Sequence, residues 1–258
     1  MIHGLDIPLD KPRVFERAVA EARPITDSAG IELLTMATNF RTAVPADWED
    51  AFATGLAACL SLFQAGFSAG IINSCYAHHS LQFPCGSTPI IDPMLSGGGF
   101  TIVHFGASRD RMQKIQEISQ WPEAMEHLRI CWKWVRESEA DDPEMAGNCG
   151  RCQKCVSNVL MFRTLDLDPP ATLDRPVSNR QIVMLRARGR QLEALRHLAH
   201  VARDRHPTAS WTLALALSVW QNRLSRVVRG IRHRLSTRLT GRRRAASRVR
   251  SSKLQAAE

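Results

Sequence analysis

The sequence lacks any apolar run long enough to cross a membrane. A spanning helix needs about 20 apolar residues in succession, and the longest candidate run, Trp211 to Trp220, reaches roughly half that length. The segment from Met1 to Asp10 also lacks the basic residues followed by an apolar stretch that mark a secretory signal. We therefore expect a cytoplasmic protein whose seven cysteines stay reduced.

Acidic residues are nearly absent from the C-terminal segment. Residues 221–258 hold twelve Arg or Lys and one acid, Glu258, whereas the first 220 residues hold 22 basic and 24 acidic residues. The formal net charge of +9 therefore comes from the tail alone. The first interpretation of such a segment is a helix packed on the body, followed by a solvated tail. The alternative is an anionic partner, either nucleic acid phosphates or an anionic membrane surface.

Strand-like and helix-like segments alternate over the first two-thirds of the chain, which predicts an α/β protein with a parallel sheet. Ser96 to Gly99 reads as a turn and Asn39 to Pro45 as a loop. Met1 to Pro8 is expected to be the end of a strand that runs into a loop. The expected buried strands are Ile31 to Ala37, Ser68 to Tyr76 and Phe100 to Phe105. The expected helices start at Pro12 or cover Asp47 to Phe63 and Arg109 to Ser119.

The last third predicts helices without strands. A helix over Val156 to Leu165 precedes a proline-rich linker, and two long helices follow over Asn179 to Arg205 and Trp211 to Leu239. In the second of these, Trp220, Leu224 and the apolar residues after them share one face. We expect three parts: an α/β domain over 1–165, a helical extension over 166–240 and a basic, disordered tail over 241–258.

Four cysteines have the spacing of a metal site. Cys149, Cys152 and Cys155 form two overlapping Cys-x-x-Cys steps, and Cys131 supplies a fourth thiolate upstream. Four thiolates satisfy tetrahedral zinc and leave no open coordination position, so we expect a structural zinc ion. Gly150 eases the turn around the metal.

Three other interpretations of these thiols stay open. A disulfide framework needs an oxidising compartment, and a redox motif usually has a single Cys-x-x-Cys pair. An iron–sulfur cluster also takes four cysteines, and spacing alone does not separate it from zinc. Cys59, Cys75 and Cys85 lack such spacing, and Cys59 lies in an apolar helical run typical of the core.

The cysteine region resembles the zinc site of the 7-cyano-7-deazaguanine synthases, which belong to the PP-loop ATP pyrophosphatases of the adenine-nucleotide α-hydrolase superfamily. The shared pattern is Asn-Cys-Gly-x-Cys-x-x-Cys followed by a helix that ends in Phe162-Arg163. The resemblance covers Met1 to Leu165 and implies a Rossmann-like, parallel-sheet (HUP) core. Weaker matching segments occur in the family's order: His3 to Pro8, Thr38 to Arg41, Gly86 to Pro93 and Arg111 to Lys114.

The resemblance implies ATP-dependent chemistry on a small molecule. ATP adenylates a carboxylate or similar oxygen, pyrophosphate leaves, and a nitrogen nucleophile attacks. In the family a Ser-Gly-Gly-x-Asp-Ser loop after the first strand holds the phosphates, and this sequence has no such loop. We therefore expect a start placed too late, a truncated gene or a second chain that supplies the missing unit, and no ATP or Mg²⁺ chemistry without it.

The same resemblance implies nucleotide- or substrate-binding roles for Arg41, Ser87, Asp92, Arg111 and Lys114. Arg111 and Lys114 share a helix face, which a solvated surface explains equally well, and Asp92 before a proline also fits a turn. The pair His78-His79 and the histidine His104, at the end of a strand, are further candidates for metal or substrate contacts.

Two functional hypotheses follow. The first is a zinc-containing remnant or partial chain of an ATP-dependent adenylating enzyme, inactive alone, with a homodimer as a candidate assembly. The second is a non-enzymatic zinc module whose basic arm binds nucleic acid or an anionic membrane surface.

Overall fold

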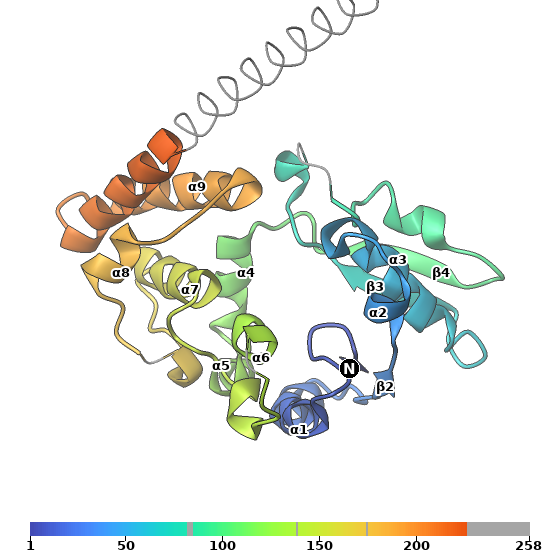
Figure 1. Ribbon diagram of the computed structural model, residues 1–258. Coiled ribbons are helices and arrows are strands. Elements are labelled where there is room, and N and C mark those ends of the chain that lie inside the picture. The colour runs from blue at the N-terminus through green and yellow to red at the C-terminus, as the bar shows by residue number, and fades with distance from the viewer. Residues whose placement is uncertain (82–84, 138, 174, 226–258) are drawn as a thin grey trace, which may run out of the picture. The chain divides into compact units, whose positions relative to one another are not determined.

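The computed structural model describes residues 1–81, 85–137, 139–173 and 175–225 (Figure 1). The chain divides into two compact units, Met1–Val177 and Ser178–Glu258. The predicted tail over 241–258 and the last part of the predicted helical extension lie outside the described residues.

The strands of unit 1 form two small parallel sheets. β1 (Ile2–His3) pairs with β2 (Met36–Ala37), and β3 (Ala69–Asn73) pairs with β4 (Thr101–Phe105). Parallel pairing is as predicted. Within the described residues, however, the two sheets do not pair with each other, so the structure shows a mixed helix and strand fold with two separate sheets.

The apolar run Ile31 to Ala37 was expected to be a buried strand, and this is wrong for most of its length. Only Met36 and Ala37 pair, because β1 offers a partner of two residues. Ile31 is 60% exposed as a result. Gly4 ends β1 with φ +97°, and a Cβ there would lie 1.8 Å from the Thr38 carbonyl oxygen, so only glycine fits.

Helix α1 (Pro12–Ser28) begins at Pro12, as predicted. The Asp141 carboxylate accepts hydrogen bonds from the backbone N–H groups of Arg13 and Val14, at 3.1 and 3.0 Å, and so satisfies donors that have no partner inside the helix. Val14 is fully buried in a cluster that includes Ile7 and Val135.

The segment Asn39 to Pro45 was predicted to be a loop, but it contains the short helix α2 (Phe40–Ala43). Thr42 Oγ donates to the Asn39 carbonyl at 2.8 Å and closes this turn. Helix α3 (Trp48–Ser61) follows, with the Asp47 side chain as its N-cap. Gly55 of α3 faces the Phe40 ring so closely that a Cβ would lie 2.9 Å from it.

The described residues cover only one face of the β3–β4 sheet. Ile72 and Ile102 are buried with residues of α3, and the 3-10 turn η2 (Asp92–Leu95) packs on β4. On the other face Ile71 is 59% exposed and Phe105 62% exposed. The prediction of fully buried strands is therefore wrong for this face. The predicted turn at Ser96 to Gly99 is confirmed by the bridge between Gly97 and Phe100.

The rest of unit 1 is helical and carries the cysteines. Helix α4 (Arg111–Ile118) packs on α7 (Gln153–Thr164). Most side chains of α7 from Cys155 to Thr164 are buried. The other elements are α5 (Pro122–His127), α6 (Lys133–Glu137) and the 3-10 turns η1 (His78–Ser80), η3 (Pro143–Ala146) and η4 (Ala171–Leu173).

Unit 2 contains α8 (Asn179–Val183), α9 (Gly189–Arg205) and a helix over residues 210–225. A single helix was predicted over Asn179 to Arg205, which is wrong at residues 184–188. The buried side chain of Asn222 explains the break, because it accepts from the Ala187 N–H and donates to the Leu185 carbonyl, at 3.0 and 2.8 Å. No described helix is long and apolar enough to span a bilayer.

Candidate metal centre and surrounding site

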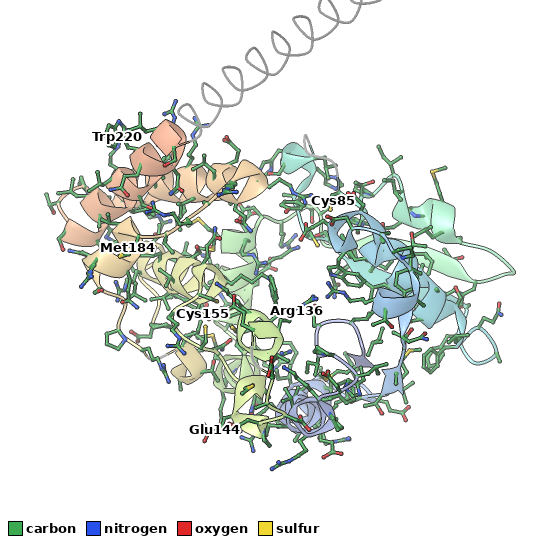
Figure 2. The ribbon with its side chains drawn as sticks, in the orientation of Figure 1. Cys85, Arg136, Glu144, Cys155, Met184 and Trp220 are labelled. Carbon is green, nitrogen blue, oxygen red and sulfur yellow. The ribbon has the colours of Figure 1, made fainter. Side chains whose placement is uncertain are left out.

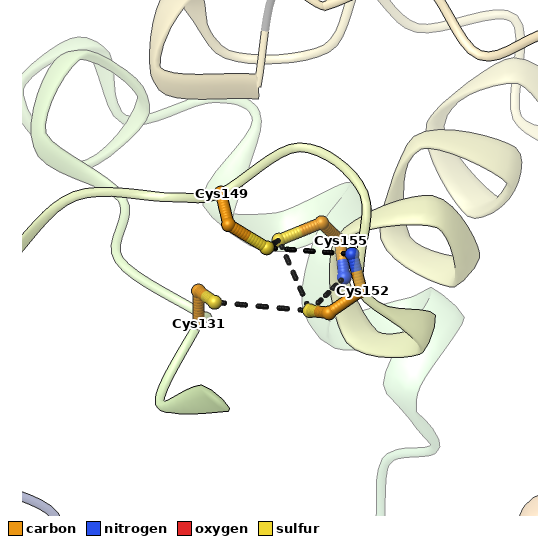
Figure 3. A group of neighbouring side chains, drawn as sticks. All are labelled: Cys131, Cys149, Cys152 and Cys155. Carbon is orange, nitrogen blue, oxygen red and sulfur yellow. Dashed lines mark hydrogen bonds between the residues drawn. The ribbon is translucent and has the colours of Figure 1, made fainter. Parts of the chain in front are cut away.

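The four predicted cysteines meet in one cluster (Figure 3). Their sulfur atoms all lie within 4.8 Å of one another. The Cys131–Cys152, Cys149–Cys155 and Cys152–Cys155 Sγ–Sγ distances are 3.7, 3.9 and 3.5 Å. Tetrahedral zinc with Zn–S bonds of about 2.3 Å requires sulfur atoms about 3.8 Å apart. The cluster therefore has the size and donor set that zinc needs.

The knuckle from Cys149 to Cys155 owes its shape to local interactions. Gly150 has φ +68°, which permits the sharp turn after Cys149. The Cys152 N–H points at Cys149 Sγ at 3.3 Å, and the Cys155 N–H points at Cys152 Sγ at 3.5 Å. Cys152 is thereby the N-cap of α7, which begins three residues earlier than expected and contains Cys155. N–H groups aimed at sulfur favour thiolates there.

Asn148 joins the distant Cys131 to this knuckle. Its Oδ1 accepts from the N–H groups of Ile130 and Cys131, at 2.9 and 3.0 Å. Its Nδ2 donates to the Leu128 carbonyl at 2.7 Å. One side chain thus fixes the backbone that carries the fourth ligand, and its role in the site was not predicted from the sequence.

Crowding of the thiols opposes their ionisation when no cation is present. The hydrogen bond with Cys131 and burial raise the pKa of Cys152 to about 11. Hydrogen bonds with Cys131 and Cys152, together with burial, raise the pKa of Cys155 strongly. Cys131, Cys149 and Cys155 are buried and Cys152 is half-buried. A divalent cation would reverse this balance, because ligating thiols lose their protons to a metal.

A basic cluster, which we define as Arg111, Lys114 and Lys154, lies beside the knuckle. Lys114 Nζ donates to the carbonyl and the hydroxyl of Ser74, at 3.0 and 2.7 Å, directly after β3. Burial and then the charge of Arg111 lower the pKa of Lys114. Burial lowers the pKa of Lys154, on α7, Asp6 raises it, and the charge of Arg111 lowers it further. The Lys154 ammonium lies over the Trp132 ring, 5.2 Å from its centroid. Lys154 was not predicted, since its position depends on the packing of α4 against α7.

A second group of cations includes Arg41 and Arg129, which both feel the charge of Asp6, the residue two positions after Gly4. Arg41 donates to the Leu5 carbonyl at 3.1 Å and stacks over Trp48 at 4.4 Å, so its guanidinium is held in place. Burial, and next the charge of Arg136 (Figure 2), lower the pKa of Arg41, while Asp6 raises it. Arg129 has buried Nε and Nη2 atoms with no hydrogen-bond partner among the described residues. Sequence reasoning missed Arg129 and Arg136.

Asp92 and Ser87 lie in the interior. The Asp92 carboxylate is fully buried and accepts from Ser87 Oγ at 2.7 Å, from the Thr88 N–H at 3.2 Å and from His104 Nδ1 at 2.6 Å. This network ties η2 to β4. The Asp92 carboxylate thus accepts three hydrogen bonds from within the protein. Ligand contact by Ser87 and Asp92 stays a prediction.

The remaining sequence candidates lie apart from the four-cysteine cluster. His78 and His79 form the turn η1, and no described group that could hold a metal includes them. Cys59 is buried in α3, as predicted. Cys75 follows β3; desolvation and then the Cys85 thiol raise its pKa, and the nearby charges of Arg111 and Lys154 lower it.

The centre therefore combines a four-thiol site with cations at the carboxyl ends of the strands. Comparison of the chain with protein-family models, with curated proteins and with solved structures finds no match.

Proposed function

We propose that unit 1 is the zinc-bearing part of an ATP-dependent adenylating enzyme of the PP-loop pyrophosphatase type, which acts on a small molecule and is inactive alone. The observation that carries this proposal is the basic cluster after β3, next to the four-thiol centre. Ligands of parallel α/β sheets bind at the carboxyl ends of the strands, and cations there suit a phosphate or carboxylate group.

The zinc ion would be structural rather than catalytic. The four thiols fill the coordination sphere of zinc, so the ion would hold Cys131 and α7 together and leave no position for substrate. Lys154 lies in the first turn of α7, between the ligands Cys152 and Cys155 in the sequence, so the folded zinc site would also orient this cation. The basic cluster, and not the metal, would then meet the anionic ligand.

The sheets support the proposal that a unit is missing. Parallel sheets are ordinarily covered on both faces, but Ile71, Val103 and Phe105 are exposed on one face of β3–β4. The described part of the chain holds two separate parallel pairs, each with two unpaired outer edges. A further strand and helix would pair with such an edge and cover such a face. In the resembling family, the unit of that kind carries the phosphate-binding loop.

Inorganic pyrophosphate and AMP are suitable probes because the substrate is unidentified. We expect calorimetry on the zinc-loaded chain to detect weak binding of one or both. The substitution Arg111→Gln should weaken that binding about tenfold by removing one charge-assisted contact. Arg203→Gln, at an exposed position of α9, is the matched control and should leave binding unchanged. Equal binding by the two variants would contradict the assignment.

Catalysis has a separate test. We expect no pyrophosphate release from ATP by the purified 258-residue chain. Sequencing the DNA immediately 5′ of the Met1 codon tests whether a phosphate-binding unit is encoded there, and an in-frame Ser-Gly-Gly-x-Asp-Ser would identify it. Pyrophosphate release from ATP by the chain as it stands would overturn the claim that it is inactive alone.

A further inference from the structure

The helix over residues 210–225 of unit 2 has two different sides. One side is buried and includes Leu215, Ser218 and Asn222. Asn222 and Ser218 both donate to the Leu185 carbonyl, at 2.8 and 3.4 Å, so this side is bound to the segment between α8 and α9. Packing within unit 2 therefore determines which side of the helix faces outward.

The outward side carries a continuous apolar stripe, formed by Leu213, Leu217, Trp220 and Leu224. Their exposed fractions are 65%, 44%, 59% and 48%, and Trp220 is labelled in Figure 2. The alternating steps of four, three and four residues keep all four on one side of the helix. Single exposed leucines are ordinary, but an uninterrupted row of large apolar side chains marks an interaction surface.

The charge of the chain changes sharply along this helix. Residues 210–222 contain no charged side chain, and Arg223 is the first of the twelve basic residues that precede Glu258. In the sequence, Val227, Val228, Ile231 and Leu235 continue the apolar spacing outside the described residues. An apolar stripe is thus joined directly to a strongly basic segment.

We propose that this stripe docks on an anionic lipid surface. Leu213, Leu217 and Leu224 enter the boundary between headgroups and acyl chains, and Trp220 lies at the interface that tryptophan prefers. The basic residues from Arg223 onward bind the lipid phosphates and carboxylates. The helix lies in the plane of the surface and does not cross the bilayer, which agrees with its buried polar side.

The charge favours lipid over the two other occupants. A second copy of the chain would bring together two segments that each carry about +11, and these would repel each other. Nucleic acid would satisfy the charges, but it offers no acyl region for four large apolar side chains. An anionic bilayer satisfies both features of the segment at once.

The experiment is flotation of the zinc-loaded, full-length chain with vesicles. Vesicles of phosphatidylcholine with phosphatidylserine are compared with vesicles of phosphatidylcholine alone. We expect wild type to float with the anionic vesicles only. The double variant L217S/W220S should bind them at least about tenfold more weakly, since two apolar anchors are lost. M184S removes an equally exposed apolar side chain of unit 2 outside the stripe and should float as wild type does.

Four results would overturn the proposal. The first is absence of wild type from the anionic vesicle fraction, and the second is flotation of L217S/W220S equal to that of wild type. The third is complete displacement of wild type from anionic vesicles by duplex DNA at equal phosphate concentration, which would assign the segment to nucleic acid. The fourth is a dimer in sedimentation equilibrium that L217S/W220S dissociates, which would assign the stripe to a second copy. Circular dichroism and zinc content of both variants establish that they are folded.

Discussion

Substitution of Asn148 by alanine tests how the fourth cysteine is held in the metal centre. The change removes the Oδ1 acceptor of the Ile130 and Cys131 N–H groups. The Leu128 carbonyl keeps a partner, because Thr172 Oγ also donates to it at 2.8 Å. Two part-buried donors are therefore left without a protein partner, at a cost of about 1–1.5 kcal/mol each.

The expected total of about 2–3 kcal/mol corresponds to a fall in zinc affinity on the order of 10²-fold, if the arm that carries Cys131 is ordered only when the ion binds. Competition with a chromophoric chelator measures this affinity directly. Asn179→Ala, which removes an exposed hydrogen bond to Ser210 in unit 2, is the control and should change nothing. Unchanged zinc affinity in Asn148→Ala would refute the reasoning that Asn148 positions Cys131.

Three further predictions concern the same unit. Gly150→Ala should destabilise the zinc-bound chain by about 1–2 kcal/mol in urea unfolding, because φ is +68° and the new Cβ would lie 2.6 Å from Arg175 Cδ. Adding Arg175→Ala should restore only part of the lost stability, and complete restoration would refute the backbone argument. The metal-free chain should lose stability as pH rises from about 9 through 11, because the folded pKa of Cys152 is raised to about 11 and the fold stabilises the neutral thiol. Cys152→Ser should flatten the dependence of unfolding free energy on pH in this range, and an unchanged slope would contradict this. Asp92→Asn should cost about 2–3 kcal/mol in urea unfolding, since an amide cannot accept from Ser87, Thr88 and His104 together; a loss near zero would show that the network is dispensable.

The metal centre was predictable because three of its ligands are neighbours in sequence. Cysteines only three residues apart cannot lie far from one another, so spacing alone brings Cys149, Cys152 and Cys155 together. Cys131 was expected from the number of ligands that zinc needs. What brings it there is Asn148, whose hydrogen bonds depend on the path of the chain 17 and 18 residues away.

The predictions failed where an apolar run was taken to imply a covering partner. Ile31 to Ala37 is as apolar as β4, but its pairing partner β1 has only two residues. Ile71 and Phe105 alternate with buried neighbours, yet no described element covers their face. Composition reports what a segment tends to bury, whereas tertiary packing decides whether anything covers it.

The charged groups show the same limit. Arg111 and Lys114 were predicted as a pair because they lie one turn apart on α4. Lys154 joins them through the packing of α4 on α7, and the buried Asp92 is contacted by His104, on β4. Local spacing predicts neighbours within an element but not the elements that fold against it.

The most direct test of the central claim is the metal content of the purified chain, by mass spectrometry, in wild type and in Cys152→Ser, with Cys75→Ser as the control outside the cluster. The four-thiol centre predicts about one zinc per chain in wild type and in the control, and loss of most of it in Cys152→Ser under mild chelation. Zinc that survives Cys152→Ser unchanged, or iron with inorganic sulfide in place of zinc, would contradict it.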